Sequence, residues 1–254
     1  MSDVYSKGEM PEYLFWVGCA GAFDERYKLV TRAFAKILNH LKVSFAVLGT
    51  EETCNGDPAR RAGNELLFQM QAFKVIELLN KYEVKKILTI CPHCYNIFKN
   101  EYPDLGGNYE VIHHTQFLAD MIKSDQLLLD KTLLKDKLIT FHDPCYLGRA
   151  NGEYAAPRKV ISSLTYKTTE MRRNKSFAFC CGAGGAQMFK EAEPGEKEVY
   201  MERTEEVLET SADIVASACP FCMTMLTDGI KYKNEEKSVK IHDIAELVTM
   251  ALGI

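Results

Sequence analysis

The chain has 254 residues, of which 46% are hydrophobic and 26% are charged, a composition typical of globular proteins and unlike that of disordered chains. Its formal net charge of −4 at pH 7 provides no global basic field, so we expect no nucleic-acid partner. Because no apolar run could span a bilayer and the N-terminus lacks a secretory signal, we expect a cytoplasmic protein whose nine cysteines stay reduced.

The first half of the chain alternates short apolar runs with amphipathic segments. The runs that are typical of buried strands are 13–18, 43–49, 85–90 and 108–114. Helical periodicity covers 27–38 and 65–79, a short helix is expected over 91–101, and a last one follows Thr115. Apolar strands that alternate with helices predict a parallel sheet covered on both faces.

The second half repeats the first. Strand-like runs recur at 138–143, 164–171, 213–218 and 238–243. Four cysteines recur at a nearly constant separation, so that Cys19, Cys54, Cys91 and Cys94 correspond to Cys145, Cys180, Cys219 and Cys222. The segments 111–122 and 240–251 also align, which pairs His113 with His242. We therefore predict an α/β protein of two tandem duplicated, doubly wound domains at 1–130 and 131–254, each with a small parallel sheet flanked by helices.

The cysteines are expected to gather at one edge of each sheet. Four of them directly follow a predicted strand, where open parallel sheets bind their ligands: Cys19, Cys91, Cys145 and Cys219. Both Cys-x-x-Cys pairs also open a helix, whose N-terminus stabilises a thiolate. All nine cysteines occupy motif positions instead of being scattered through helices as small apolar residues. The pattern predicts one metal pocket in each half.

The spacing discriminates between three kinds of thiol chemistry. All-thiolate sites bind zinc, copper(I) or iron–sulfur clusters. A four-cysteine zinc site usually joins two closely spaced Cys-x-x-Cys pairs, whereas each half has one pair and distant single cysteines. Thioredoxin-like exchange would leave the unpaired cysteines unused. Adjacent Cys180 and Cys181 favour iron–sulfur clusters, because neighbouring thiolates can bridge two irons but fit poorly around one zinc ion.

The second half resembles the cysteine-rich CCG domain in three phrases, HDPCYLGR (142–149), FCCGAGG (179–185) and ACPFC (218–222). This domain occurs, usually twice, in heterodisulfide reductase B and D subunits, in the C subunit of anaerobic glycerol-3-phosphate dehydrogenase and in lactate-utilisation iron–sulfur proteins. The resemblance implies an electron-transfer or disulfide-reducing subunit. It also implies a noncubane 4Fe–4S cluster with the ligands Cys145, Cys180, Cys181, Cys219 and Cys222.

The first half departs from that pattern, because Asn55 stands where the second cysteine of the triplet would be. Four cysteines suit a cubane 4Fe–4S cluster with one thiolate per iron. We therefore expect a relay cubane on Cys19, Cys54, Cys91 and Cys94, and an unusual, catalytic cluster in the second half.

Four histidines and one aspartate are further candidates. His142 and Asp143 precede Cys145 at a strand end and are candidate catalytic proton donors, although a turn-capping aspartate beside a loop-bound histidine would give the same pattern. His93 could hydrogen-bond a sulfur of the first cluster. The aligned His113 and His242 suggest a shared structural role such as capping.

The chain has no ferredoxin motif, dinucleotide fingerprint or integral membrane segment, so it needs a redox partner. The expected partner is a ferredoxin-domain iron–sulfur protein or a flavoprotein dehydrogenase, with peripheral membrane association only through that partner. We expect an iron–sulfur oxidoreductase subunit that reduces a disulfide at its second cluster. The alternatives are a non-catalytic electron-transfer subunit, linking a 2-hydroxy-acid or glycerol-3-phosphate dehydrogenase to the quinone pool, and a zinc-stabilised structural protein.

Overall fold

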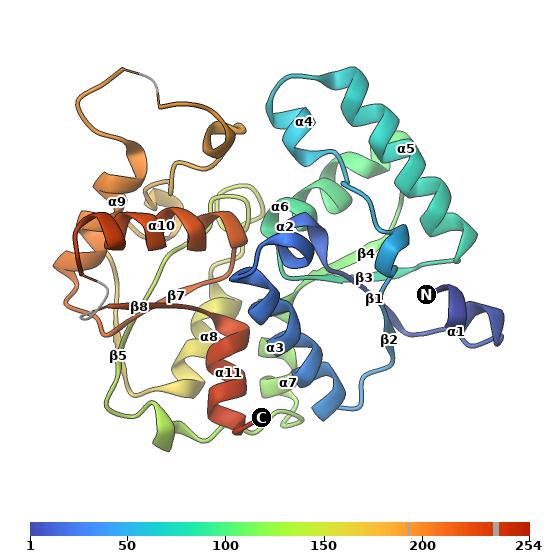
Figure 1. Cartoon of the computed structure of the whole chain (residues 1–254). Coiled ribbons are helices and arrows are strands. Elements are labelled where there is room, and N and C mark those ends of the chain that lie inside the picture. Colours follow the sequence, from blue (N-terminus) through green and yellow to red (C-terminus); the bar gives the residue numbers. More distant parts are fainter. Residues whose placement is uncertain (193, 236–238) are drawn as a thin grey trace.

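The computed structural model describes residues 1–192, 194–235 and 239–254 and contains two four-stranded sheets (Figure 1). The first sheet has the order β2 (Phe45–Ala46), β1 (Tyr13–Trp16), β3 (Lys86–Thr89) and β4 (Glu110–His113). The second has the order β6 (Lys167–Thr169), β5 (Leu138–Phe141), β7 (Ile214–Ser217) and β8 (Lys240–Asp243). All neighbouring strands are parallel. The predicted α/β class with two duplicated parallel sheets is confirmed.

The inner strands β1, β3, β5 and β7 are almost completely buried, because both of their faces are covered. Every residue of β7 is buried, as are the last three residues of β1, β3 and β5. Such strands appear in the sequence as continuous apolar runs. The edge strands β2 and β6 are shorter than the predicted 43–49 and 164–171. The predicted run 238–243 begins to pair at Lys240, and its first residue lies outside the described part of the chain.

Helices connect the strands and cover both sheets. In the first half they are α1 (Ser2–Ser6), α2 (Gly18–Phe23), α3 (Tyr27–His40), α4 (Asp57–Arg61), α5 (Glu65–Lys81), α6 (Pro92–Asn96) with a π-helical extension (Ile97–Glu101), and α7 (His114–Lys123). In the second half they are α8 (Ala155–Leu164), α9 (Val199–Glu209), α10 (Pro220–Tyr232) and α11 (Ile244–Leu252). Short 3₁₀ turns lie at Gly49–Glu51, Tyr102–Leu105, Lys131–Leu133, Lys175–Phe177 and Gln187–Phe189. Within the described residues, none of the helices combines the length and apolar character needed to cross a membrane.

The strand register corrects one of the equivalences between the two halves that the sequence predicted. Thr89 pairs with His113, and Ser217, which corresponds to Thr89, pairs with Asp243. His113 and Asp243 are also the residues that precede α7 and α11. The predicted pairing of His113 with His242 is therefore wrong by one residue, because the last two strands of the second half are separated by a longer connection than that alignment allowed. Capping by this position is found in both halves, where the backbone N–H of His113 donates to Gln116 and that of Asp243 to Glu246.

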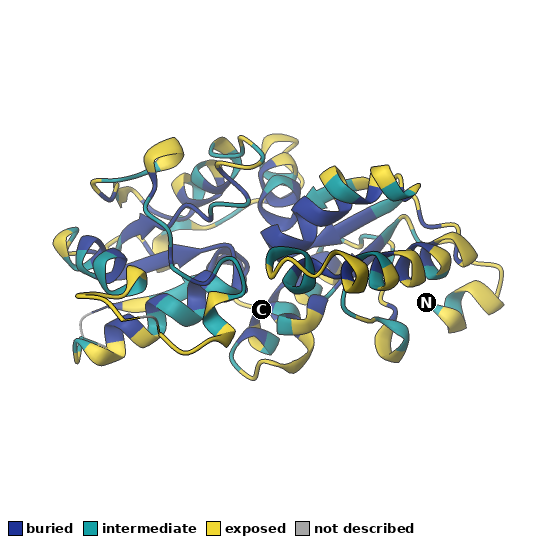
Figure 2. Cartoon of the chain, turned by 90° about the horizontal axis from the view of Figure 1, so that it is seen from above, coloured by how far each residue is buried: buried dark blue, intermediate teal, exposed yellow. Residues whose placement is uncertain are grey.

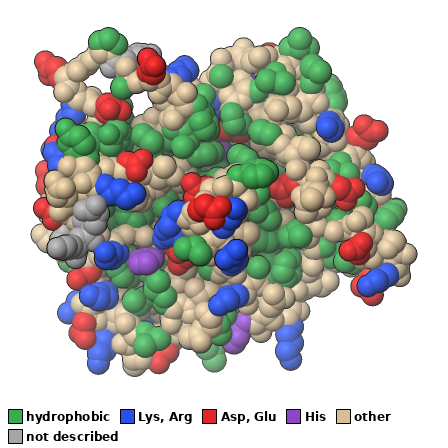
Figure 3. All heavy atoms as spheres, viewed as in Figure 1, with side chains coloured by type: hydrophobic (Ala, Val, Ile, Leu, Met, Phe, Trp, Pro, Cys, Tyr) green, Lys and Arg blue, Asp and Glu red, His purple; other side chains and the backbone are tan. Residues whose placement is uncertain are grey.

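The two halves share one hydrophobic core. Helix α3 packs against α11, and α7 packs against α8, so four helices form the interface between the sheets (Figure 1). One continuous cluster of buried side chains includes Phe34, Leu38 and Phe117 of the first half with Leu164 and Leu247 of the second. Seen from above, buried residues run through both sheets, while exposed residues form the periphery (Figure 2). On the face shown in Figure 3, acidic and basic side chains are interspersed, in line with the small net charge.

Candidate metal centres

Three thiols of the first half, those of Cys19, Cys91 and Cys94, line one small cavity beyond the carboxyl ends of β1 and β3, and the thiol of Cys54 lies near Cys19. Cys19 lies in α2, Cys54 precedes α4, and Cys91 and Cys94 open α6. Cys91 and Cys94 are hydrogen-bonded to each other, and the thiols of Cys91 and Cys54 lie close enough to Cys19 to influence its ionisation. Burial, with added repulsion from these two thiols, raises the pKa of Cys19 to about 11. A bound cation would relieve this crowding, so the donor set fits a thiolate-bound metal centre.

Two further groups of the first half shape this centre. The carboxylate of Glu52 accepts hydrogen bonds from the backbone N–H groups of Val17, at 3.2 Å, and Gly18, at 2.6 Å, which holds the turn that presents Cys19. Burial raises the pKa of Glu52 to about 7. Trp16 is buried, and among the described residues its indole N–H has no hydrogen-bond partner. A side chain at Gly18 would lie within 4 Å of both that nitrogen and the sulfur of Cys94, so the indole donor lies beside the thiols. An unpaired buried donor at this place fits a sulfur-rich acceptor.

Five thiols of the second half form one connected series. Cys145 follows β5, Cys180 and Cys181 lie in the loop after the 3₁₀ turn Lys175–Phe177, and Cys219 and Cys222 open α10. Side-chain hydrogen bonds link them in the order Cys145, Cys180, Cys181, Cys222 and Cys219. The bonds from Cys145 and Cys181 lower the pKa of Cys180. Burial opposes ionisation of Cys219, but hydrogen bonds from Cys222 and His93 outweigh it and lower the pKa of Cys219 to about 5. Cys180 and Cys219 are thus predisposed to form thiolates, the state that binds metals, whereas hydrogen bonds to neighbouring thiols and burial raise the pKa values of Cys145, Cys181 and Cys222.

Glycine turns support one cysteine in each half in the same way. Gly56 and Gly182 have φ angles of 91° and 88°, a region that side chains other than glycine rarely adopt. Their backbone N–H groups donate to the sulfurs of Cys54, at 3.4 Å, and Cys180, at 3.3 Å. The Cys-x-Gly turns of both halves therefore stabilise a thiolate equally.

His142 lies against the second group of thiols. One of its ring nitrogens and the sulfurs of Cys181 and Cys222 all lie within 4.8 Å of one another. The guanidinium of Arg203, which is fully buried, donates from Nε to Nδ1 of His142 at 3.0 Å. Burial and the charge of Arg203 lower the pKa of His142 well below its ordinary value. Because Nδ1 accepts the hydrogen bond from Arg203, the neutral ring carries its proton on Nε2.

Asp143 has a different set of partners. Its carboxylate accepts two hydrogen bonds from Arg158, at 2.8 and 2.9 Å, and one from the backbone N–H of Lys175 at 2.8 Å. These contacts join the end of β5 to α8 and to the segment that leads to Cys180. Arg158 and Arg203 were not singled out in the sequence, because their partners are distant along the chain.

His93 and Phe221, the equivalent residues within the two Cys-x-x-Cys motifs, each contact the opposite half. The ring of His93 is hydrogen-bonded to Cys219, while Phe221 lines the small cavity beside Cys19, Cys91 and Cys94. The two rings meet edge to face, with 4.9 Å between their centroids. The sequence predicted a sulfur of the first centre as the partner of His93, and the structure instead gives it a sulfur of the second.

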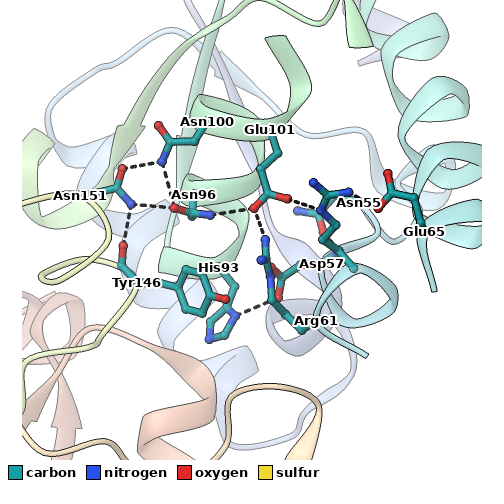
Figure 4. A network of polar contacts seen from close by, with 11 residues as sticks. Asn55, Asp57, Arg61, Glu65, His93, Asn96, Asn100, Glu101, Tyr146 and Asn151 are labelled. Carbon is teal, nitrogen blue, oxygen red and sulfur yellow. Dashed lines mark hydrogen bonds and ion pairs between the residues drawn. The ribbon is translucent and has the colours of Figure 1, made fainter. Parts of the chain in front are cut away.

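A polar network surrounds His93 (Figure 4). Nδ1 of His93 lies 2.8 Å from the carboxylate of Asp57, which also accepts from Nε of Arg61 at 3.0 Å. Burial opposes ionisation of Asp57, but these two hydrogen bonds outweigh it and lower the pKa of Asp57. Burial also disfavours the charged ring of His93, but the bonds to Asp57 and Cys219 outweigh it and raise the pKa of His93. Arg61 pairs in turn with Glu101.

The same network extends into the second half. Nδ2 of Asn96 donates to Glu101 at 3.0 Å, and Oδ1 of Asn96 accepts from Asn100 and from Asn151 of the second half (Figure 4). Asn151 also donates to the backbone carbonyl of Tyr146, the residue after Cys145. No sequence spacing signals these residues, because they meet only where the two halves pack together.

Comparison with known proteins agrees with this geometry. A model of the family described as "CCG: Cysteine-rich domain" matches residues 13–99 and 139–227. The chain is 45% identical to the probable iron-sulfur-binding oxidoreductase FadF of Bacillus subtilis, over 99% of this chain and 36% of that protein. It is 44% identical to the EtfAB:quinone oxidoreductase of Syntrophomonas wolfei, over 96% of this chain and 35% of that protein.

A third relative is the D subunit of the dihydromethanophenazine:CoB–CoM heterodisulfide reductase of Methanosarcina barkeri, with 40% identity over 96% of this chain and 59% of that protein. The chain thus spans about a third of the length of the first two relatives and less than two thirds of the third. Among solved structures, glutamate racemase from Francisella tularensis covers 96% of this chain and 79% of its own at 14% identity, with a TM-score of 0.38, which is too low to support an argument.

Proposed function

The chain belongs to the CCG cysteine-rich domain family, and on this premise we propose that it is an iron–sulfur electron-transfer subunit with one cluster in each half. The observation that carries the proposal is the connected series of five thiols in the second half, beside a separate group of four in the first. When bound, iron–sulfur clusters accept and release single electrons.

The number of thiols favours iron–sulfur clusters over structural zinc. A tetrahedral zinc ion takes four ligands, whereas five cysteines of the second half are hydrogen-bonded in one series that includes the adjacent Cys180 and Cys181. The relatives named as an iron-sulfur-binding oxidoreductase and as a heterodisulfide reductase subunit support the same choice. We assign a cubane 4Fe–4S cluster to the four cysteines of the first half and a noncubane 4Fe–4S cluster to the five of the second.

We place the reactive centre in the second half. A cavity of about 960 Å³ reaches Gly182, next to Cys181, and is also lined by Met188, Met225 and Tyr200. The cavity at the first centre has a volume of only about 20 Å³. A small disulfide could approach the second centre along this cavity by way of Gly182, although none of the cavity's described lining residues is a cysteine. One ring nitrogen of His142 lies within 4.8 Å of the sulfurs of Cys181 and Cys222, and His142 remains our candidate proton donor, with Asp143 positioning this segment through Arg158.

The second candidate is a carrier without a substrate of its own. The relative named as an EtfAB:quinone oxidoreductase favours it, since that name places that relative between EtfAB and a quinone. In either case we propose a flavoprotein dehydrogenase or a ferredoxin-domain protein as the redox partner, and peripheral membrane association through that partner. Turnover of a small disulfide with a chemical reductant separates the two candidates, because a pure carrier would show none.

The matched variants Cys181→Ser and Cys94→Ser test which cluster reacts with the substrate and which one only delivers electrons. In anaerobically reconstituted protein, we expect Cys181→Ser to abolish disulfide turnover while the electron paramagnetic resonance (EPR) signal of the first cluster stays intact. We expect Cys94→Ser to slow electron delivery and to leave the spectral change on substrate binding at the second cluster unaltered. Iron and sulfide counts accompany both variants.

Two outcomes would contradict the proposal. Colourless anaerobic protein that binds zinc would rule out both redox functions. A normal substrate-induced spectral change in Cys181→Ser, together with its loss in Cys94→Ser, would instead place the reactive centre in the first half.

A further inference from the structure

Trp16 is the only tryptophan of the chain, and it ends β1 beside the thiols of the first half. The residue is 1% exposed and belongs to the same buried cluster of side chains as Cys91 and Cys94. Phe98 packs edge to face on its ring, with 4.7 Å between the ring centroids. Packing therefore holds the indole in the interior, next to two of the cysteines.

The indole N–H of Trp16 has no hydrogen-bond acceptor among residues 1–192, 194–235 and 239–254. An indole nitrogen can only donate, and a buried donor without an acceptor costs free energy, so such groups are rare in native proteins. The space beside this N–H is bordered by a sulfur. A Cβ added at Gly18 would lie 3.9 Å from Nε1 of Trp16 and 3.4 Å from Sγ of Cys94, so both atoms face the same point.

The backbone keeps this space free of side chains. Gly18 has a φ angle of 77°, which residues with a Cβ rarely adopt, so position 18 leaves room between the indole and the thiol. The carboxylate of Glu52 holds this segment in place by accepting from the backbone N–H groups of Val17 and Gly18. The N–H of Trp16 thus points to a place where a sulfur of a bound cluster would complete its hydrogen bonding.

The repeat places a nitrogen-bearing ring at the same point of the second half. Trp16 and His142 each stand three residues before the first cysteine of their half, at the ends of β1 and β5. One ring nitrogen of His142 lies within 4.8 Å of two cysteine sulfurs of the second half. The two side chains differ in size and shape, and any apolar ring would satisfy packing at either place. Their common feature is a ring nitrogen beside the thiols.

We infer that the indole N–H of Trp16 donates a hydrogen bond to a sulfur of the first cluster and thereby raises the reduction potential of that cluster. The inference rests on the proposed function, which places a cluster on the four cysteines of the first half. A reduced cluster carries one more negative charge than an oxidised one, and a donor to sulfur stabilises that charge. The hydrogen bond of Trp16 therefore favours the reduced state of the first cluster.

The test compares three forms of the anaerobically reconstituted chain with the unaltered protein. Trp16→Phe removes the donor and keeps a buried aromatic ring. Because Trp16 is the sole tryptophan, it can also be replaced throughout by benzothienylalanine, which has the shape of tryptophan with sulfur in place of the N–H. Phe15→Leu is the matched control, since Phe15 is equally buried in β1 but packs on Phe34 in the core shared by both halves.

Redox titration followed by EPR gives the midpoint potentials of both clusters, with the two signals assigned by Cys181→Ser. We expect Trp16→Phe and the benzothienylalanine form to shift the potential of the first cluster to more negative values and to leave that of the second unchanged. Phe15→Leu should shift neither. With ¹⁵N-indole tryptophan, which labels one site, pulsed EPR of the reduced first cluster should detect a coupling to that nitrogen.

An unshifted first potential in the benzothienylalanine form, a shift of equal size in Phe15→Leu, or the absence of the ¹⁵N coupling would each overturn the inference. The coupling is measured in the unaltered protein, so it decides even if Trp16→Phe does not assemble its clusters. Failure of the proposed function is recognised separately, because the unaltered chain would then yield no iron–sulfur EPR signal after reconstitution.

Discussion

Asn55 distinguishes the two thiol groups at the scale of single residues. It occupies the position of Cys181, is buried, and accepts a hydrogen bond at Oδ1 from the backbone N–H of Asp57 at 3.2 Å. Its backbone carbonyl accepts from the hydroxyl of Tyr102 at 3.0 Å. Asn55 thus holds the turn that starts α4 and presents Asp57 to His93, a structural role that a thiol would not replace.

We expect Asn55→Cys to retain the spectrum of the first cluster and not to acquire that of the second. The added thiol lacks the longer loop of the second half, which carries two more residues between the corresponding cysteines. Loss of the bond to Asp57 should also cost about 1 kcal/mol of stability. EPR and visible spectra of the reconstituted variant check the cluster type.

Asn55→Ser is the matched control for this variant, because serine can still accept from Asp57 and adds no thiol. Appearance of the spectrum of the second cluster in the first half of Asn55→Cys would mean that the missing thiol was the only obstacle.

At the scale of elements, Asp243 joins the start of α11 to the first half. Its carboxylate accepts from the backbone N–H of Ala245 at 2.9 Å, and lies 3.0 Å from Nε2 of His114 and 3.1 Å from the hydroxyl of Tyr27. Asp243 and His114 are both fully buried. Arg26 adds a two-pronged ion pair with Glu246 one turn later. The four interface helices are therefore held by specific polar contacts as well as by apolar packing.

We expect Asp243→Ala to lower the free energy of unfolding by about 3–5 kcal/mol, because it removes a helix cap and leaves the buried His114 without its acceptor. Asp136→Ala is the control, since Asp136 is exposed and pairs with Lys167 at 3.8 Å on the surface. Its effect should stay within about 0.5 kcal/mol. Anaerobic urea titrations followed by circular dichroism measure the free energy of unfolding of both variants. Equal losses in the two variants would show that the buried contact of Asp243 with His114 does not stabilise the protein.

At the scale of the whole molecule, both the core and the centres cross the boundary between the repeats. The main cluster of buried side chains draws on both halves, and α2, which carries Cys19, contacts α10, which carries Cys222. His93 and Phe221 each reach the opposite centre. We therefore expect the two duplicated sheets to unfold as one cooperative unit.

We expect neither residues 1–130 nor residues 131–254 to fold alone, because each fragment would expose its share of the common core to water. The separate fragments should lack near-ultraviolet circular dichroism and bind the dye ANS, and mixing them should restore the native signal. A native spectrum from either isolated fragment would show that the predicted domains are independent.

Local sequence determined the repeat, the strands and the gathering of the cysteines. These features depend on periodicity and on residues near one another along the chain, and a parallel sheet brings the ends of its strands to a common edge. The short length of β2 and β6 and the equivalence of His113 and Asp243 could not be predicted from local sequence. Strand partners and register depend on contacts between strands that are far apart along the chain.

Only the tertiary structure decided which groups serve which centre. The partner of His93 is Cys219, the partner of His142 is Arg203, and Asp57 and Glu52 are drawn in from loops with no motif of their own. Within the sequence, His93 lies next to two cysteines of the first half, and this proximity predicted the wrong partner. The physical reason is that the two halves pack with α2 of the first against α10 of the second, and the side chains at such a contact meet across a distance in sequence that no local pattern encodes.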